Sequence, residues 1–270
     1  MKTISQLIIT MMICLFSIQA WAQSGKLFNT DNQLSSNLAT QVFQDKSGFI
    51  WIATRNGLNN YDGYHINVIK KDMSNFLGLN SNYINSIAQD EKEHILLGTN
   101  NSLLEFTGSE FLKIPMLDSK GKELATYVKQ VYPLKNKDVA VATSGYGIML
   151  KKQDEQKCHA MKGEVEKLKY IHKLLEDKRG RLWIITEDGK LYRKETNGRV
   201  TSHFVGTEGV NAQDIQQDAL GNIYLASKNQ GVHLLRAGSN VFTRISSIGN
   251  LPIDNMEISR NNKRYIGCDR

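Results

Sequence analysis

The stretch ATQVFQDKSGFIWIATRNGL, residues 39–58, holds two apolar runs joined by a polar turn and ends in a second turn. The turns Asp45 to Gly48 and Arg55 to Gly57 favour tight hairpins, because Gly accepts a positive φ and Asp or Asn bonds the local backbone. The pattern predicts a four-stranded antiparallel unit, with strands at 39–44, 49–54, 58–61 and near 65–70.

This unit recurs along the chain, and the six copies start near residues 39, 84, 128, 171, 212 and 253. The position of Trp51 reads Leu96, Ala140, Trp183, Tyr224 and Tyr265 in the later copies, at steps of 45, 44, 43, 41 and 41 residues. The positions of Ala39 and Val42 are apolar in all six copies. A period of this length is typical of a radial array of four-stranded sheets.

The second strand of the unit explains why the unit must be repeated. In GFIWIAT, residues 48–54, both faces of the strand are apolar, so it needs cover on both sides. Radial packing supplies that cover, because each sheet buries the faces of its neighbours. We therefore predict an all-β fold, a β-propeller of four-stranded blades, here with six repeats of which the last is incomplete. We expect the aromatic rings in the Trp51 position to pack between blades: Trp51, Trp183, Tyr224 and Tyr265.

Residues 34–63 resemble the two-component regulator propeller repeat, which occurs in the periplasmic sensor halves of Bacteroidetes hybrid two-component systems. The likeness rests on Leu34-Ser35-Ser36-Asn37, Asp45, Gly48, Trp51, Thr54, Gly57-Leu58 and Tyr61-Asp62-Gly63. Later copies depart from it: Leu134 replaces the Asp, Lys137 the Gly and Cys268 the Thr. The resemblance implies a seven-bladed propeller that senses a carbohydrate-related signal, an oligosaccharide ligand, and a dimeric, membrane-anchored kinase that follows the propeller.

The N-terminus has the pattern of a secretory signal. A basic start is followed by an apolar run at residues 7–18 and by Ala20-Trp21-Ala22, so we expect cleavage before Gln23 and a periplasmic location. The expected organisation is a signal peptide at 1–22 and a partial β-propeller sensor domain at 23–270. After cleavage only Cys158 and Cys268 remain, and whether they pair stays open.

No kinase motif or receiver-type acidic cluster is recognised in the sequence, so we expect a chain that binds without transducing and is not an enzyme. We expect a fragment, a truncated gene or one piece of a split gene. We also expect residues 26–31 to form a strand of the final blade. The formal net charge of +7 suggests acidic partners such as sulfated or uronic-acid glycans, but Lys and Glu are interspersed, as at residues 151–169, which favours a solvated surface. A nucleic-acid partner would conflict with export.

Catalytic and metal-binding constellations are weak in this sequence, and we predict no catalytic residue, no metal site and no cofactor. The six histidines occupy unrelated positions of their repeats and show no metal-ligand spacing. The recurring aspartates are interpreted as turn residues that bond the local backbone: Asp45, Asp90, Asp177 and Asp218.

A ligand site is expected where the loops entering the first strand and the loops between the second and third strands meet on one face. Amides, an Arg and a Tyr suit hydrogen bonding and ring stacking with a sugar, and they also suit turns. The candidate residues are Asn37, Arg55, Asn56, Asn82, Tyr83 and Asn100. Two alternatives remain: an enzyme like the propeller lyases that act on cyclic peptide antibiotics, and a protein-interaction scaffold.

Overall fold

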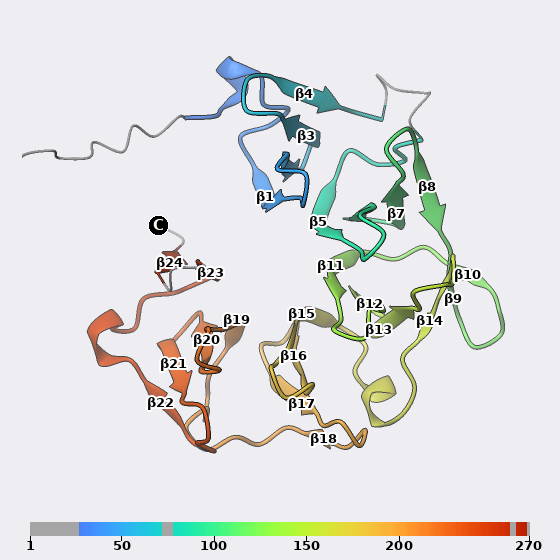
Figure 1. Ribbon diagram of the computed structural model, residues 1–270. Coiled ribbons are helices and arrows are strands. Elements are labelled where there is room, and N and C mark those ends of the chain that lie inside the picture. Colours follow the sequence, from blue (N-terminus) through green and yellow to red (C-terminus); the bar gives the residue numbers. More distant parts are fainter. Residues whose placement is uncertain (1–26, 72–77, 260–262, 269–270) are drawn as a thin grey trace, which may run out of the picture.

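The computed structural model describes residues 27–71, 78–259 and 263–268 (Figure 1). The predicted signal peptide at 1–22 and its cleavage site before Gln23 lie outside these residues. Within the described ranges, no helix has the length and apolar character needed to span a membrane.

The described strands form six sheets, which we call blades 1 to 6 in chain order, and their pairing is antiparallel except for one pair in blade 3. Blade 1 contains β1 (Ala39–Gln44), β2 (Ile50–Thr54), β3 (Gly57–Tyr61) and β4 (Ile66–Ile69). Blade 2 contains β5 (Ile84–Gln89), β6 (Ile95–Thr99), β7 (Leu103–Phe106) and β8 (Phe111–Ile114). Blade 3 contains β11 (Val128–Pro133), β12 (Val139–Thr143), β13 (Ile148–Lys151) and β14 (Cys158–Ala160), extended at its outer edge by β9 (Met116–Leu117) and β10 (Glu123–Leu124).

Blade 4 contains β15 (Ile171–Glu176), β16 (Leu182–Thr186), β17 (Leu191–Lys194) and β18 (Val200–Thr201). Blade 5 contains β19 (Ala212–Gln217), β20 (Ile223–Ser227), β21 (Gly231–Leu235) and β22 (Phe242–Arg244). Blade 6 contains β23 (Asn255–Ile258) and β24 (Arg264–Gly267). Three short 3-10 helices complete the described elements: η1 (Thr30–Asn32), η2 (Glu164–Lys167) and η3 (Ser246–Ile248).

The blades are arranged around a centre, with the first strand of each blade innermost (Figure 1). The predicted all-β propeller is therefore confirmed, and the four strands of the first repeat lie within one residue of their predicted positions. The parallel pairing of β14 with β9 was not foreseen. It places Cys158 opposite Met116, and burial raises the pKa of the Cys158 thiol to about 12. Cys158 and Cys268 are not bonded to each other.

The hydrophobic core lies between the blades, as predicted. Trp51 packs on Phe106 of blade 2 with ring centroids 5.8 Å apart, and Trp183 packs on Phe242 of blade 5 at 6.0 Å. Each ring in this position therefore points towards the following blade. The prediction was wrong for Tyr265, which is 57% exposed, because no described blade follows blade 6.

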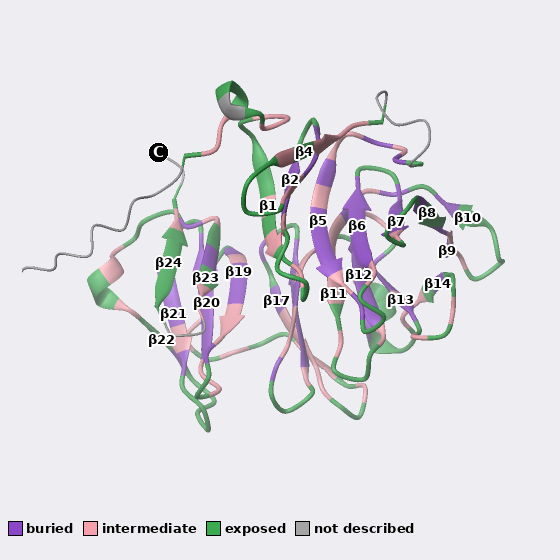
Figure 2. Ribbon diagram, turned by 45° about the horizontal axis from the view of Figure 1, so that its top comes forward, coloured by how far each residue is buried: buried purple, intermediate pink, exposed green. Residues whose placement is uncertain are grey.

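The opposite end of the array shows the same effect. Val42 is 62% exposed, although its counterparts in blades 2 to 6 are all buried. Figure 2 shows β1 and β24 largely exposed, in contrast to the buried β6 and β12. The strand predicted at 26–31 is not seen among the described residues of that segment: η1 begins at Thr30, and Phe28 contacts Tyr61 edge to face at 5.0 Å.

The recurring aspartates are turn residues, as the sequence indicated. Asp177 Oδ1 accepts the backbone N–H groups of Arg179 and Arg181 at 2.9 and 3.1 Å, and Oδ2 accepts Trp183 Nε1–H at 2.9 Å. Burial opposes ionisation of Asp177, but the hydrogen bonds from Arg181 and Trp183 outweigh it and lower the pKa of the carboxyl group. The aspartate therefore joins the turn to the ring between the blades.

Candidate functional site

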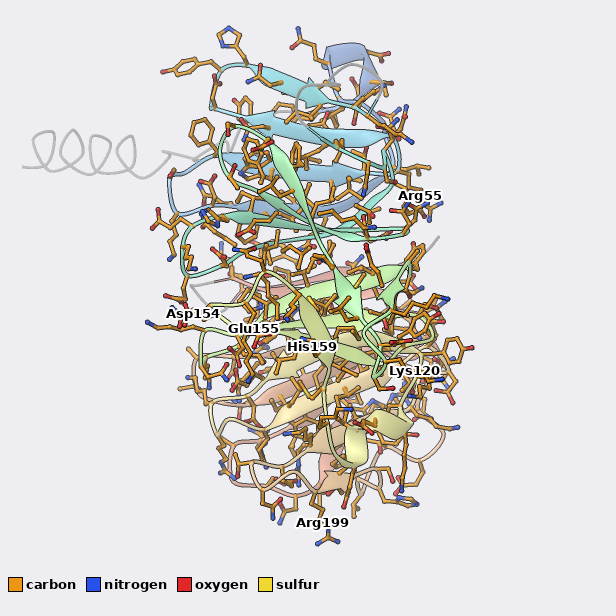
Figure 3. All side chains as sticks on the ribbon, turned by 90° about the vertical axis from the view of Figure 1, so that its right-hand side faces the viewer. Arg55, Lys120, Asp154, Glu155, His159 and Arg199 are labelled. Atoms are coloured by element: carbon orange, nitrogen blue, oxygen red, sulfur yellow. The ribbon has the colours of Figure 1, made fainter. Side chains whose placement is uncertain are left out.

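The inner strands of all six blades line a central channel with a volume of about 860 Å³. One mouth of this channel carries the loops between the second and third strands. Arg55 belongs to this face of the molecule, whereas Asp154 lies on the opposite face (Figure 3).

A β-bulge recurs in the innermost strand of every complete blade. The pairing register shifts directly after the first residue of β1, β5, β11, β15 and β19. A bulge leaves one extra residue unpaired and changes the direction of its side chain. The unpaired residues all line the channel: Thr40, Asn85, Lys129, His172 and Gln213.

The residue after each bulge joins its blade to the next one. Gln41 accepts the backbone N–H of Ile87 at 2.8 Å and donates to the Ile87 carbonyl at 3.0 Å. The same acceptor role falls to Ser86, Gln130 and Asp214, which bond the N–H groups of Val131, Leu174 and Met256 at 3.0, 2.6 and 2.8 Å. Between blades 4 and 5, Lys173 Nζ lies 3.2 Å from Asp214 Oδ1 instead. These polar residues therefore hold the inner ring together.

The channel mouth brings together five side chains from four blades, which we call the mouth cluster: Arg55, Tyr83, Tyr127, Lys129 and Glu187. The Arg55 guanidinium carbon lies 5.6 Å from the centroid of the Tyr83 ring, and this ring meets the Tyr127 ring edge to face at 6.1 Å. Lys129 Nζ lies 4.6 Å from the Tyr127 centroid and 3.2 Å from Glu187 Oε1. The cluster offers two aromatic rings, two cations and a carboxylate.

The charges of the mouth cluster are unevenly matched. Lys129 is paired with Glu187, whereas Arg55 is exposed and makes no ion pair with any described residue. Burial raises the pKa of Tyr127, whose hydroxyl donates to Asn85 Oδ1 at 2.8 Å, so the phenol is neutral and fixed in orientation. Burial, together with Lys173 and Lys129, lowers the pKa of His172. The His172 imidazole is therefore neutral at neutral pH, and Arg55 supplies an unpaired positive charge.

The predicted site residues divide into two groups in the structure. Arg55 and Tyr83 stack on each other at the channel. The side-chain amides of the four asparagines bond residues that lie 7 to 21 positions away in the chain: Asn37 with Thr30, Asn56 with Ser35, Asn82 with Lys71 and Asn100 with Ser81. In these contacts the asparagines tie one segment of the chain to another, and their role in ligand binding stays a prediction.

Sequence reasoning missed Tyr127, Lys129 and the bulge residues that line the channel. A signal was present, because each repeat has two polar residues between the apolar positions of Ala39 and Val42. Strict alternation would place those two residues on opposite faces of the strand. The bulge places both polar side chains at the channel wall. Its signature in the sequence is the pair of polar residues that recurs at the same position of each repeat.

Comparisons with known proteins agree with this architecture. The family model described as two component regulator propeller matches residues 33–56, 78–101 and 167–188. No curated protein matches the chain in sequence. These three segments coincide with the first, second and fourth repeats, so the chain is a β-propeller that contains two component regulator propeller repeats.

Solved structures show the same fold at low sequence identity. The extracellular domain of a putative hybrid two component system from B. thetaiotaomicron superposes with a TM-score of 0.71 at 18% identity, over 85% of this chain and 34% of that one. PorZ of Porphyromonas gingivalis, a surface component of the type-IX secretion system, gives 0.67 at 13% identity, over 91% and 40%. The chain thus spans about a third of the length of the extracellular domain that it resembles.

A lyase also has this architecture. The virginiamycin B lyase of Staphylococcus aureus, solved as an inactive variant with quinupristin, gives a TM-score of 0.63 at 12% identity, over 87% of this chain and 79% of that one. At 12% identity this likeness shows the fold alone. Whether the protein binds a ligand or catalyses a reaction has to be argued from the residues at its site.

Proposed function

We propose that this propeller is the ligand-sensing region of a periplasmic hybrid two-component regulator, that it binds a carbohydrate-derived ligand at the channel mouth, and that it has no catalytic activity. The observation that supports this proposal most directly is the mouth cluster. The two component regulator propeller repeats and the likeness to an extracellular sensor domain support the same role.

The chemistry of the mouth cluster suits a sugar. The faces of Tyr83 and Tyr127 provide apolar surfaces on which the C–H face of a pyranose ring can stack. Around these rings stand planar donors and acceptors, of which Arg55 can form paired hydrogen bonds to a carboxylate, a sulfate or vicinal hydroxyl groups. The pairing of Lys129 with Glu187 leaves Arg55 as the group that would meet a negative charge on the ligand.

Catalysis has little support from the described channel lining. The resemblance to propeller lyases implies a histidine and a glutamate with a divalent metal at the channel mouth. The channel lining includes His172 and Glu257, but these residues belong to blades 4 and 6 and no hydrogen bond or ion pair joins them among the described residues. Glu187 is held by Lys129 at 3.2 Å. In the proposed sensor, transmission of the signal would be the task of a membrane-anchored, dimeric kinase.

A glycan array probed with the purified protein tests the proposal. We expect binding to a limited set of glycans, with acidic glycans favoured. Arg55→Ala and Tyr83→Ala should each weaken that binding by about tenfold or more, the loss expected when a buried or stacked anchor is truncated.

Two controls separate recognition from folding and from catalysis. Tyr64→Ala removes a tyrosine that is 85% exposed in blade 1 and outside the channel lining, so it should leave glycan binding unchanged. Incubation with a streptogramin and Mg²⁺ should leave the cyclic peptide intact. Equal binding by wild type, Arg55→Ala and Tyr83→Ala, or metal-dependent opening of the peptide, would contradict the proposed function.

A further inference from the structure

Blade 2 departs from a contact between the turn aspartate and a core ring that blades 1, 4 and 5 share. In those three blades, Oδ2 of the aspartate accepts a hydrogen bond from the ring six residues later, on the strand that follows the turn: Trp51 at 2.8 Å, Trp183 at 2.9 Å and Tyr224 at 3.2 Å. In blade 2 this position is Leu96, which has no donor. Asp90, the turn aspartate of blade 2, therefore has no ring that can donate a hydrogen bond to its Oδ2 atom.

Asp90 is nevertheless buried and ionisable. Its side chain is 7% exposed, and its Oδ1 accepts the N–H groups of Lys92 and His94 at 2.9 Å each. Its Oδ2 receives no hydrogen bond from the described part of the chain. The nearest basic atom to Oδ2 is His94 Nδ1, at 3.8 Å. Ionising a carboxyl group whose side chain is mostly buried is costly, and a cation that approaches its free oxygen lowers that cost.

A second carboxylate faces the same imidazole from the neighbouring strand. Glu105 of β7 pairs across the strands with Leu96, and its side chain is 3% exposed. Glu105 Oε1 lies 2.6 Å from His94 Nδ1. In blade 4 the corresponding cross-strand residue is Arg193, which lies over the Trp183 ring. Blade 2 thus replaces a ring and a cation by an aliphatic side chain and a carboxylate.

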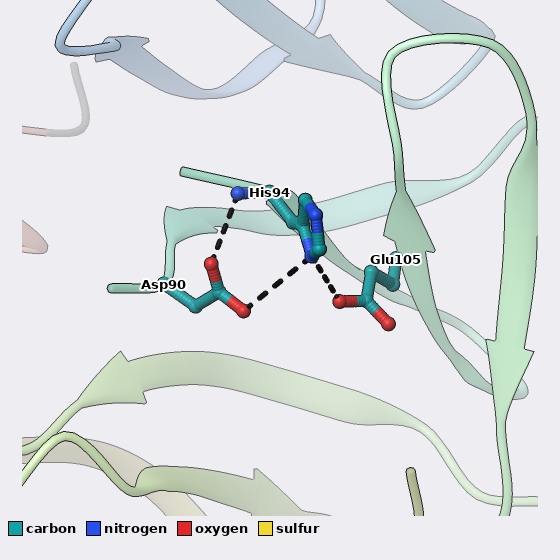
Figure 4. A group of neighbouring side chains, drawn as sticks. All are labelled: Asp90, His94 and Glu105. Carbon is teal, nitrogen blue, oxygen red and sulfur yellow. Dashed lines mark hydrogen bonds and ion pairs between the residues drawn. The ribbon is translucent and has the colours of Figure 1, made fainter. Parts of the chain in front are cut away.

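The three side chains converge on a small space at the turn between β5 and β6 (Figure 4). One ligand atom from each of Asp90, His94 and Glu105 lies within 4.8 Å of the others. Two carboxylates and one imidazole carry a net negative charge even when the imidazole is protonated. The three side chains thus lack enough positive charge to balance the two carboxylates, and their O, N and O atoms converge on one space. Both features are typical of a cation site.

We propose that Asp90, His94 and Glu105 bind a Zn²⁺ ion that links the turn between β5 and β6 to β7. An imidazole nitrogen with two carboxylate oxygens suits Zn²⁺, whereas Mg²⁺ and Ca²⁺ prefer oxygen ligands alone. The fourth position is open to water, because the His94 side chain is 31% exposed. On binding, His94 Nδ1 gives its lone pair to the metal, and any proton carried by that nitrogen leaves to solvent.

Isothermal titration of the EDTA-treated full chain with ZnCl₂ tests this proposal. We expect one Zn²⁺ per chain and a rise in thermal stability at saturating metal. His94→Asn should weaken binding by more than about tenfold, since even the loss of an outer-shell partner has an effect of this size. Asn is well tolerated at this position, because Asn222 occupies it in blade 5 and donates to Asp218 Oδ2 at 2.8 Å.

The controls distinguish this site from adventitious metal binding by histidine. Glu105→Gln keeps the size of the side chain and an acceptor for His94 while it removes the charge, so it should also lose affinity by more than about tenfold. His159→Asn changes a histidine on β14 of blade 3, 3.7 Å from the Glu155 carboxylate, and should bind Zn²⁺ as the wild type does. No binding by the wild type, or wild-type affinity in Glu105→Gln, would overturn the proposal whatever the folding of His94→Asn.

Discussion

Replacing Trp183 by Ala gives the sharpest measure of how strongly one blade supports the next. The ring is completely buried, packs on Phe204 and Phe242 at 5.2 and 6.0 Å, and donates a hydrogen bond to Asp177. A buried tryptophan removes about 150–250 Å² from water. At about 25 cal/mol per Å² this burial is worth about 4–6 kcal/mol, of which alanine retains a small part.

We therefore expect Trp183→Ala to lower the free energy of unfolding by about 3–5 kcal/mol, the range found for buried aromatic rings. This loss is a large fraction of the total stability of a typical domain, about 5–15 kcal/mol. Trp51→Ala should fall in the same range, because Trp51 is 6% exposed and also packs on the following blade.

Urea denaturation followed by far-UV circular dichroism measures the effect, with the m value used to check that the transition stays cooperative. Tyr265→Ala is the matched control, since Tyr265 occupies the same position of its repeat but is 57% exposed. It should change the free energy of unfolding by about 0.5 kcal/mol or less. Similar losses for Trp183→Ala and Tyr265→Ala, or a loss below about 1 kcal/mol for Trp183→Ala, would refute the assignment of the core to the spaces between blades.

Three further predictions follow from single residues. Lys137 has a φ of 72° at a turn position that is Gly in the first, fourth and fifth repeats, so Lys137→Gly should stabilise the protein by about 1 kcal/mol in the same denaturation assay; a destabilised variant would contradict this. The pKa of Asp177 is lowered in the folded state, so its contribution to stability is present above the unfolded-state pKa near ~3.9 and is lost as the pH falls through the folded-state value. Between about pH 5 and 3 the free energy of unfolding should consequently fall less in Asp177→Asn than in the wild type. An equal fall in both proteins would contradict a stabilising role of the ionised Asp177 carboxylate. The mature protein from its native host should begin at or near Gln23, and N-terminal sequencing that finds Met1 would disprove cleavage.

The sequence alone determined the propeller and most of its strand positions. Hairpin turns depend on residues that are close in the chain, such as Asp45 and Gly48, and strand faces follow from alternation within a few residues. The structure has β1 at Ala39–Gln44, the range that the pattern predicted. The repeat period then indicated how the sheets pack, because one unit has two apolar faces and only its neighbours can cover them.

The tertiary structure decided which side chains meet across blades. Arg55 and Tyr83 are 28 positions apart in the chain, and both were recognised as candidates, but their stacking and the contacts of Tyr127 and Lys129 depend on how neighbouring blades are set around the channel. The bulge in each inner strand decided which polar side chains line that channel, since it breaks the alternation on which sequence reasoning relies.

The same limit explains why His94 was set aside and why Tyr265 was misplaced. His94 showed no ligand spacing in the sequence, because its partner Glu105 lies on another strand and reaches it through the pairing of Leu96 with Glu105. Tyr265 has the residue type of a core ring, but burial requires a neighbouring blade on its side. Local patterns show which faces of a strand are apolar and require burial. Only the packing of blades around the axis decides whether those faces are buried and which charged side chains come into contact.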